Sequence, residues 1–226
     1  MTRGVIIVAG GRGVRMGGDL PKQFIPVCGK PVLMHTIETF NRWDAQAKLV
    51  VVLPEAHREY WDMLCRELDC RIAHQVVAGG ETRFHSVRNG LRQMTDCEII
   101  GVHDGVRPFV SAEVVEACFD MAERRGAVAP VVPVEESIRF CDGRGNHAVN
   151  RADYCIVQTP QVFRAEILLD AYNRPYTPDF TDDASVVEAS GITVSLVESN
   201  RENIKITSPA DLAVAEYLIA SKRDNS

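Results

Sequence analysis

Short runs of apolar, mostly β-branched residues alternate along the chain with stretches in which apolar residues recur at helical spacing. The apolar runs, which are predicted to form buried strands, cover residues 4–9, 48–54, 72–78, 98–104 and 127–134. The stretches predicted to be helices lie between them, at residues 31–43, 55–68, 81–94 and 111–125. Alternation of this kind predicts right-handed strand–helix–strand units, and therefore a Rossmann-like α/β fold with a mostly parallel sheet flanked by helices.

The remaining third of the chain continues the pattern. We predict a strand at 155–163, a helix at 165–172, a short helix from Thr181 and a strand at 192–198. A final helix begins at "SPAD" (208–211), where a serine cap, a proline in the first helical position and a returning aspartate stand together. There is no internal repeat or linker, so a single domain spanning residues 1–226 is expected.

The segment 136–151 interrupts the alternation. It contains two short alternating pieces around Asp142-Gly143 and Gly145-Asn146, which favour a β-hairpin. A lone two-stranded ribbon is marginally stable in water and needs a surface to pack against. We therefore predict a projecting arm, inserted at about 135–158, that serves dimerisation; a decorated loop is the alternative.

Composition narrows the class of protein. The 226 residues carry a formal net charge of −6, which argues against nucleic acid as a partner. No apolar run approaches the roughly 18 residues of a membrane span. The seven cysteines include no C-x-x-C pair, which is unlike a disulfide framework or a zinc site and favours a reducing, cytoplasmic location.

The loop after the first predicted strand, "VAGGRGVRMGGDLPKQF" (8–24), combines glycines with Arg12, Arg15 and Lys22. Glycines let backbone N–H groups approach a ligand closely, and the cations indicate that this ligand is an anion such as a phosphate. A Walker A loop is absent, and a dinucleotide fingerprint fails because Met16 stands where its third glycine belongs. A mobile turn with solvated cations is the alternative reading of the loop alone.

Candidate site residues also follow two other predicted strands. One is followed by "AGGETRFHS", with Ser86 one to two helical turns on, and another by "HDGVRPF", which brings Asp104 to the edge of the sheet. A carboxylate there suits Mg²⁺, although a helix cap is an alternative role. Lys205 precedes the last helix and Arg151 closes the hairpin. Because ligands bind at the carboxyl edge of open α/β sheets, these charges favour a phosphate site there.

Motifs for nucleophilic catalysis are absent. There is neither a G-x-S-x-G elbow nor an H-E-x-x-H pair, and the six histidines are dispersed. Only His103, beside Asp104, stands near the candidate site. Chemistry without a side-chain nucleophile suits phosphoryl-type transfer, in which positioning and charge neutralisation dominate.

Six segments in order resemble one family: "AGGRGVRMGGDLPKQF", "AGGETRFHSV", "HDGVRPF", "NRADYCIVQTPQVF", "TDDAS" and "ENIKITSP". Together they resemble the 2-C-methyl-D-erythritol 4-phosphate cytidylyltransferases over about residues 4–220. The resemblance implies a nucleotidyltransferase fold, CTP and the sugar-alcohol phosphate as substrates, Mg²⁺ as cofactor, and a homodimer in which the arm crosses to the other subunit.

The resemblance also implies residue roles. Arg15 and Lys22 stabilise the α-phosphate at which the bond forms, while Arg151 and Lys205 hold the sugar phosphate. By the same resemblance, Asp104 is expected to bind magnesium and ribose. The residues that contact the nucleotide or support the site are Ala9, Gly10, Gly11, Gly13, Gly80, Glu81, Ser86, Gly105, Ser137, Thr159 and Thr181.

Some positions depart from the family pattern. Gly10 stands where alanine is usual, and Glu81 where many members have aspartate, which bears on cytosine recognition. The related ribitol 5-phosphate cytidylyltransferases share the loop, the "TPQ" motif and the late lysine, and are one alternative. The other is a catalytically silent nucleotide-binding module, which would lack Lys22 or Asp104; both are present.

Overall fold

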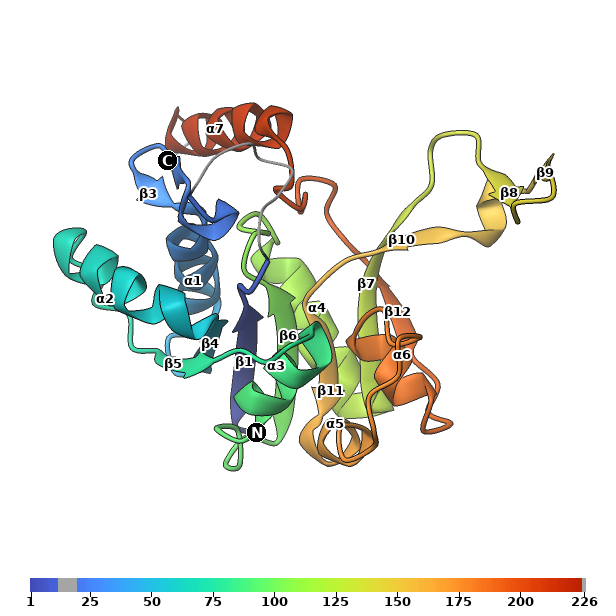
Figure 1. The fold of residues 1–226 in the computed structure, drawn as a ribbon, viewed down its shortest axis with the longest axis horizontal. Coiled ribbons are helices and arrows are strands. Elements are labelled where there is room, and N and C mark those ends of the chain that lie inside the picture. Colours follow the sequence, from blue (N-terminus) through green and yellow to red (C-terminus); the bar gives the residue numbers. More distant parts are fainter. Residues whose placement is uncertain (12–19, 225–226) are drawn as a thin grey trace.

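The computed structural model describes residues 1–11 and 20–224, and that part of the chain is built on one eight-stranded sheet (Figure 1). The strands follow the order β10-β7-β11-β6-β1-β4-β5, and β12 also pairs with β7. Their bounds are β1 Arg3–Val8, β4 Lys48–Leu53, β5 Gln75–Ala78, β6 Ile99–Asp104, β7 Ala127–Pro133, β10 Cys155–Val157, β11 Gln161–Arg164 and β12 Ser195–Glu198.

The sheet is mixed. β1 pairs in parallel with β4 and β6, β4 with β5, and β12 with β7, as the alternating pattern predicts. The single strand predicted at 155–163 is wrong in detail, because it is divided into β10 and β11, which pair antiparallel with different parts of β7. Pro160 lies in the interruption, and a proline has no N–H to donate to a ladder. β11 also pairs antiparallel with β6 and so separates β6 from β7.

Helices cover both faces of the sheet. The core on one face includes α1 (Val32–Trp43), α2 (Arg58–Glu67) and α4 (Ala112–Arg125). The other core includes α3 (Arg83–Leu91), α5 (Ala165–Ala171) and α6 (Asp183–Glu188). Successive side chains of a strand point to opposite faces, and accordingly Val5 and Ile7 of β1 enter the first core and Ile6 the second.

The last helix, α7 (Pro209–Asp224), lies beside the small ribbon of β2 (Pro26–Val27) and β3 (Lys30–Pro31). Its predicted cap is confirmed, since Asp211 accepts a hydrogen bond from the Ser208 N–H at 2.8 Å and its own N–H faces the Ser208 hydroxyl at 3.4 Å. No helix within residues 1–11 and 20–224 is long and apolar enough to cross a membrane.

The predicted hairpin is confirmed. β8 (Arg139–Cys141) pairs antiparallel with β9 (Asn146–Ala148) as a sheet of its own. In Figure 1 this ribbon stands at the end of a long extension from β7 and β10, away from the main sheet. Its residues are exposed, so within one chain the arm has little to pack against.

Candidate active site

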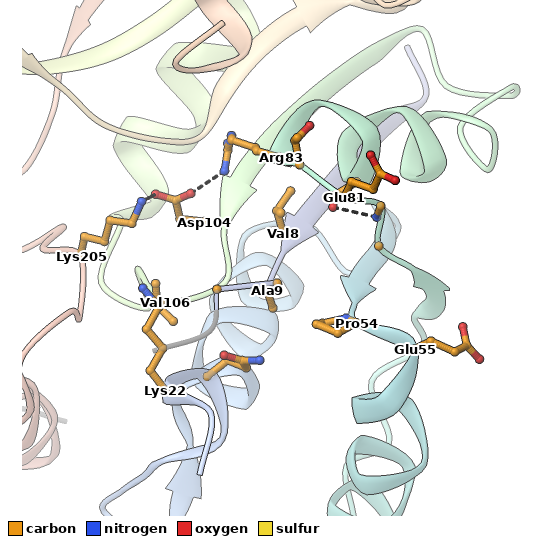
Figure 2. A pocket seen from close by; sticks show the side chains of 17 residues that line it. Val8, Ala9, Lys22, Pro54, Glu55, Glu81, Arg83, Asp104, Val106 and Lys205 are labelled. Carbon is orange, nitrogen blue, oxygen red and sulfur yellow. Dashed lines mark hydrogen bonds and ion pairs between the residues drawn. The ribbon is translucent and has the colours of Figure 1, made fainter. Parts of the chain in front are cut away.

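A cavity of about 510 Å³ lies where the parallel strands end (Figure 2). Ala9 follows β1, Pro54 follows β4, Gly79 follows β5, and Asp104 ends β6; all four line the cavity. Its size is typical of small-molecule sites. Nine of the residues predicted from sequence line it: Ala9, Gly10, Gly11, Lys22, Gly80, Glu81, Ser86, Asp104 and Lys205.

Gly80 brings the loop after β5 against the first turn of α3. A Cβ atom built on Gly80 would lie 2.3 Å from Cβ of His85, so a larger residue would push the loop away. The Gly80 N–H donates to Oγ of Ser86 at 3.1 Å, which fixes the loop to the helix. Gly10 differs, since a Cβ built there would meet no described atom within 4 Å. This glycine leaves open space beside the cavity.

Asp104 is the charged centre of the cavity wall. Its Oδ1 accepts from Nη1 of Arg83 at 2.8 Å, and its Oδ2 lies 3.1 Å from Nε of Arg107 and 3.0 Å from Nζ of Lys205. Burial alone would raise the pKa of Asp104, but the cations of Arg83, Lys205 and Arg107 outweigh it and hold that pKa well below its usual range. The carboxylate is therefore ionised.

Arg83 is shared with a second carboxylate. Its Nη2 donates to Oδ2 of Asp183 at 2.6 Å, and the buried Asp183 also accepts from the hydroxyl of Tyr172 at 2.7 Å. Burial and, next, the charge of Asp183 raise the pKa of Tyr172, so this phenol keeps its proton and donates. The chain of contacts connects α5 and α6 with Asp104 in the cavity.

The backbone of Asp104 is held by a buried network. Its N–H donates to Oγ1 of Thr159 at 3.1 Å, and that hydroxyl lies 3.1 Å from Nδ1 of His103. Nε2 of His103 lies 2.9 Å from the carbonyl of Arg107, so Nε2 carries the proton and Nδ1 accepts from Thr159. Burial lowers the pKa of His103 to about 4, consistent with this neutral tautomer. Thr159 therefore positions Asp104 from behind the cavity wall.

Replacing Thr159 by valine is expected to lower the free energy of unfolding by about 1–3 kcal/mol, because the Asp104 N–H and His103 Nδ1 would lose their buried partner. Chemical denaturation measures this change. Thr95→Val is the matched control, because Thr95 is exposed. Equal unfolding free energies for the two variants would contradict the network.

Several predicted site residues lie elsewhere. Gly105 stands behind the wall: its N–H donates to the carbonyl of Val8 at 2.9 Å, and a Cβ on it would lie 2.8 Å from Cβ of Ala9. Ser137 and Arg151 are exposed on the arm, and Thr181 is exposed before α6, so within one chain none of the three lines the cavity. Gly13 and Arg15 lie outside the described residues.

The sequence-based list missed Arg83, Arg107, Asp183 and Gln23. Each stands inside a segment quoted for the family resemblance, and Arg83 follows the predicted Gly80 by three residues. For the three charged residues, a charge within such a segment was the available signal; the amide of Gln23 gave none. Charge could not reveal the pairing, because Arg83 and Asp183 are 100 residues apart.

The arrangement suits a phosphorylated ligand. The cavity offers glycine backbone, the cations Lys22, Arg83 and Lys205, and the carboxyl groups of Glu55, Glu81 and Asp104, of which Asp104 is held ionised by the cations around it. Among the described lining residues the hydroxyls are those of Thr82 and Ser86, and both hold the start of α3 through hydrogen bonds. In the described part of the chain no three His, Cys, Asp or Glu side chains gather as a metal site. Positioning and charge neutralisation are what this cavity can supply.

Known proteins agree with this chemistry. The family described as 2-C-methyl-D-erythritol 4-phosphate cytidylyltransferase matches residues 4–221. Relatives with that name from Bacteroides thetaiotaomicron and Porphyromonas gingivalis are each 54% identical, over 97% of this chain and 100% and 98% of their own lengths. The crystal structure of the Thermus thermophilus 2-C-methyl-D-erythritol 4-phosphate cytidylyltransferase superposes with a TM-score of 0.78 at 31% identity, covering 96% of this chain and 98% of that one.

The matched range includes the strand ends at the cavity and every described residue that lines it. The resemblance read from six sequence segments is therefore confirmed along nearly the whole chain, as is the Rossmann-like fold. With the cationic cavity and these relatives in agreement, the chain belongs to the 2-C-methyl-D-erythritol 4-phosphate cytidylyltransferase family.

Proposed function

We propose that this chain transfers the cytidylyl group of CTP to 2-C-methyl-D-erythritol 4-phosphate, giving 4-diphosphocytidyl-2-C-methyl-D-erythritol and pyrophosphate. The observation that carries the proposal is the cavity at the carboxyl edge of the sheet, where Arg83 and Lys205 pair with Asp104 and Lys22 lines the same wall. It occurs in a chain 54% identical to relatives named for this activity.

The reaction fits the side chains present. The attacking group is a phosphate monoester, which is already anionic near neutral pH and needs no general base. Its difficulty is repulsion between the acceptor phosphate and the triphosphate. Fixed cations relieve that repulsion, and their effect is greatest where charge develops in the transition state. Lys22 and Lys205, on separate elements of the cavity, supply such charge.

The nucleoside part of CTP is assigned to the loop after β5. Gly80 and Ser86 form a fixed wall, and Glu81 stands beside them. A wall made largely of backbone groups can distinguish the exocyclic amine of cytosine from the carbonyl of uracil by hydrogen bonding.

Mg²⁺ is the proposed cofactor, with Asp104 as its protein ligand. The donor chemistry fits, because Asp104 is ionised and Mg²⁺ binds through one or two carboxylates while phosphate oxygens and water complete its shell. Lys205, whose side chain is 43% exposed, is the most accessible of the three cations on Asp104. Bound to Asp104, the ion would neutralise charge on the triphosphate.

The proposal includes a homodimer formed through the arm. Phe140, Tyr154 and Ile156 are about half exposed on or beside it, an unusual display of apolar surface for an extension with so little packing of its own. The arm also carries Ser137 and Arg151, away from the cavity of its own chain. We place the protein in the cytoplasm because all seven cysteines are free thiols.

Pyrophosphate release tests the function. Purified protein is supplied with CTP and Mg²⁺, together with methylerythritol phosphate, ribitol 5-phosphate or no acceptor. Release only with methylerythritol phosphate is expected, abolished by EDTA and much slower with UTP. Equal rates with ribitol 5-phosphate would overturn the acceptor assignment. A rate unchanged by EDTA would overturn the assignment of Mg²⁺ as cofactor.

Arg151 is expected to serve the cavity of the other subunit. An inactive Lys22→Ala protein mixed with an inactive Arg151→Ala protein, under conditions that exchange subunits, should recover up to about a quarter of wild-type activity. Half of the dimers are then mixed, and one of their two sites carries neither defect. Demonstrated exchange without recovery would show that Arg151 does not act across an interface.

A further inference from the structure

Gln23 is a buried polar side chain in the wall of the cavity. It lines the cavity beside Lys22, and its exposed fraction is 0%. Neither Oε1 nor Nε2 of Gln23 has a hydrogen-bond partner among the residues that the structure describes. A primary amide offers two donor hydrogens and an acceptor oxygen, and native proteins rarely bury such a group unpaired.

The other buried glutamines show the ordinary arrangement. Gln161, 1% exposed, donates from Nε2 to Asp182 at 2.7 Å and accepts from the Ala184 N–H at 2.8 Å. Gln158 accepts at Oε1 from the side chains of Ser199 and Asn203. Neither of these two glutamines lines the cavity. Among the buried glutamines of the described chain, the one that is unpaired at both ends is therefore the one in the cavity wall.

The backbone of Gln23 is well held. It lies in the 3-10 helix Lys22–Phe24, where the Phe24 N–H donates to the carbonyl of Pro21 at 2.9 Å. The Phe24 ring packs against Tyr60 and Trp61, with centroid distances of 5.2 and 6.2 Å. The unpaired amide is therefore not the result of a loosely packed segment. Because Gln23 lines the cavity, a ligand bound there can supply the missing partner.

We propose that Gln23 is a nucleotide-contacting residue whose amide pairs with the nucleoside part of bound CTP. The inference rests on the proposed function and adds a residue to that site. Phosphate oxygens only accept hydrogen bonds, so they would leave Oε1 of Gln23 unpaired. The cytosine edge and the ribose hydroxyls each offer a donor together with an acceptor, which is what this amide lacks.

The test measures stability and affinity on one variant. Gln23→Met keeps the length of the side chain and removes both polar ends. If the amide is unpaired until CTP arrives, the free variant should melt at a higher temperature than wild type, because replacing an unsatisfied buried group by an apolar one is stabilising. Its Kd for CTP with Mg²⁺ and no acceptor, measured by calorimetry, should rise about tenfold. Gln23→Leu serves as a second apolar variant.

Gln161→Met is the matched control for the melting temperature. It removes a buried amide that is paired at both ends, and should therefore melt below wild type. A lower melting temperature for Gln23→Met, or an unchanged Kd for CTP, would overturn the proposal. Comparing CTP with 2′-deoxy-CTP assigns the contact: a smaller effect of the variant on the deoxy analogue indicates the ribose, and an equal effect indicates the base. Failure of wild type to bind CTP would instead refute the proposed function.

Discussion

Replacing Lys22 by alanine is expected to lower kcat by about 10²–10³-fold, with a much smaller change in the KM for CTP. Lys22 lines the cavity directly beside the glycines that follow β1; a Cβ on Gly11 would lie 3.0 Å from its Cε. Charge at the reacting phosphorus grows mainly in the transition state, so a cation aimed there stabilises that state more than the ground state. Loss of one such donor costs roughly 3–4 kcal/mol of activation free energy.

Steady-state kinetics with saturating acceptor measures the effect. The control is Lys48→Ala, which removes a lysine at the amino end of β4, where it pairs with Asp96 at 2.6 Å, far from the strand ends that form the cavity. Its kcat should stay near wild type. Near-wild-type turnover by Lys22→Ala would show that its charge is not used on the reacting phosphate.

Asp104→Asn is expected to lose nearly all activity and also stability. The substitution leaves the cations of Arg83, Arg107 and Lys205 facing one another without the carboxylate that they share. Removing one partner from a buried ion pair costs about 3–5 kcal/mol, because the remaining charge is uncompensated. Activity falls in addition because the cations move and the proposed metal ligand is weakened.

Two measurements separate these effects. Denaturant unfolding reports the stability, and pyrophosphate release at a temperature where the variant remains folded reports the activity. Asp96→Asn is the control, since Asp96 is an exposed partner of Lys48 and surface pairs contribute little. An Asp104→Asn protein with wild-type stability would contradict the role of Asp104 as the common anion of this cluster.

The main strands and the cavity were predictable because both depend on local signals. A buried strand between two helical layers is apolar on both faces, and the run at 98–104 shows this. The glycine pair after β5 and the aspartate at the end of β6 mark the edge where parallel strands finish. Once the sheet is parallel, residues that follow its strands must meet there.

The antiparallel position of β11 was not predictable in the same way. Apolar runs carry no direction, so 155–163 has the same appearance as a parallel strand. The ladder to β6, in which Phe163 pairs with Ile100, depends on how the arm returns the chain to the sheet. The pairing of Arg83 with Asp183 has the same origin, because β11 and the helices after it bring α6 beside α3.

By itself the sequence determined the class of fold, the hairpin, and the family with its phosphate chemistry, because hydrophobic period, turn residues and ordered motifs act over short distances along the chain. Only the tertiary structure decided which charges share a partner. Asp104 is one carboxylate among many in the sequence. It becomes the centre of three cations because Arg83 of α3 and Lys205, from the segment before α7, join Arg107, which follows Asp104 by three residues. The tertiary structure also decided that the amide of Gln23 is unpaired, since burial and the absence of a partner within the described chain depend on packing in three dimensions.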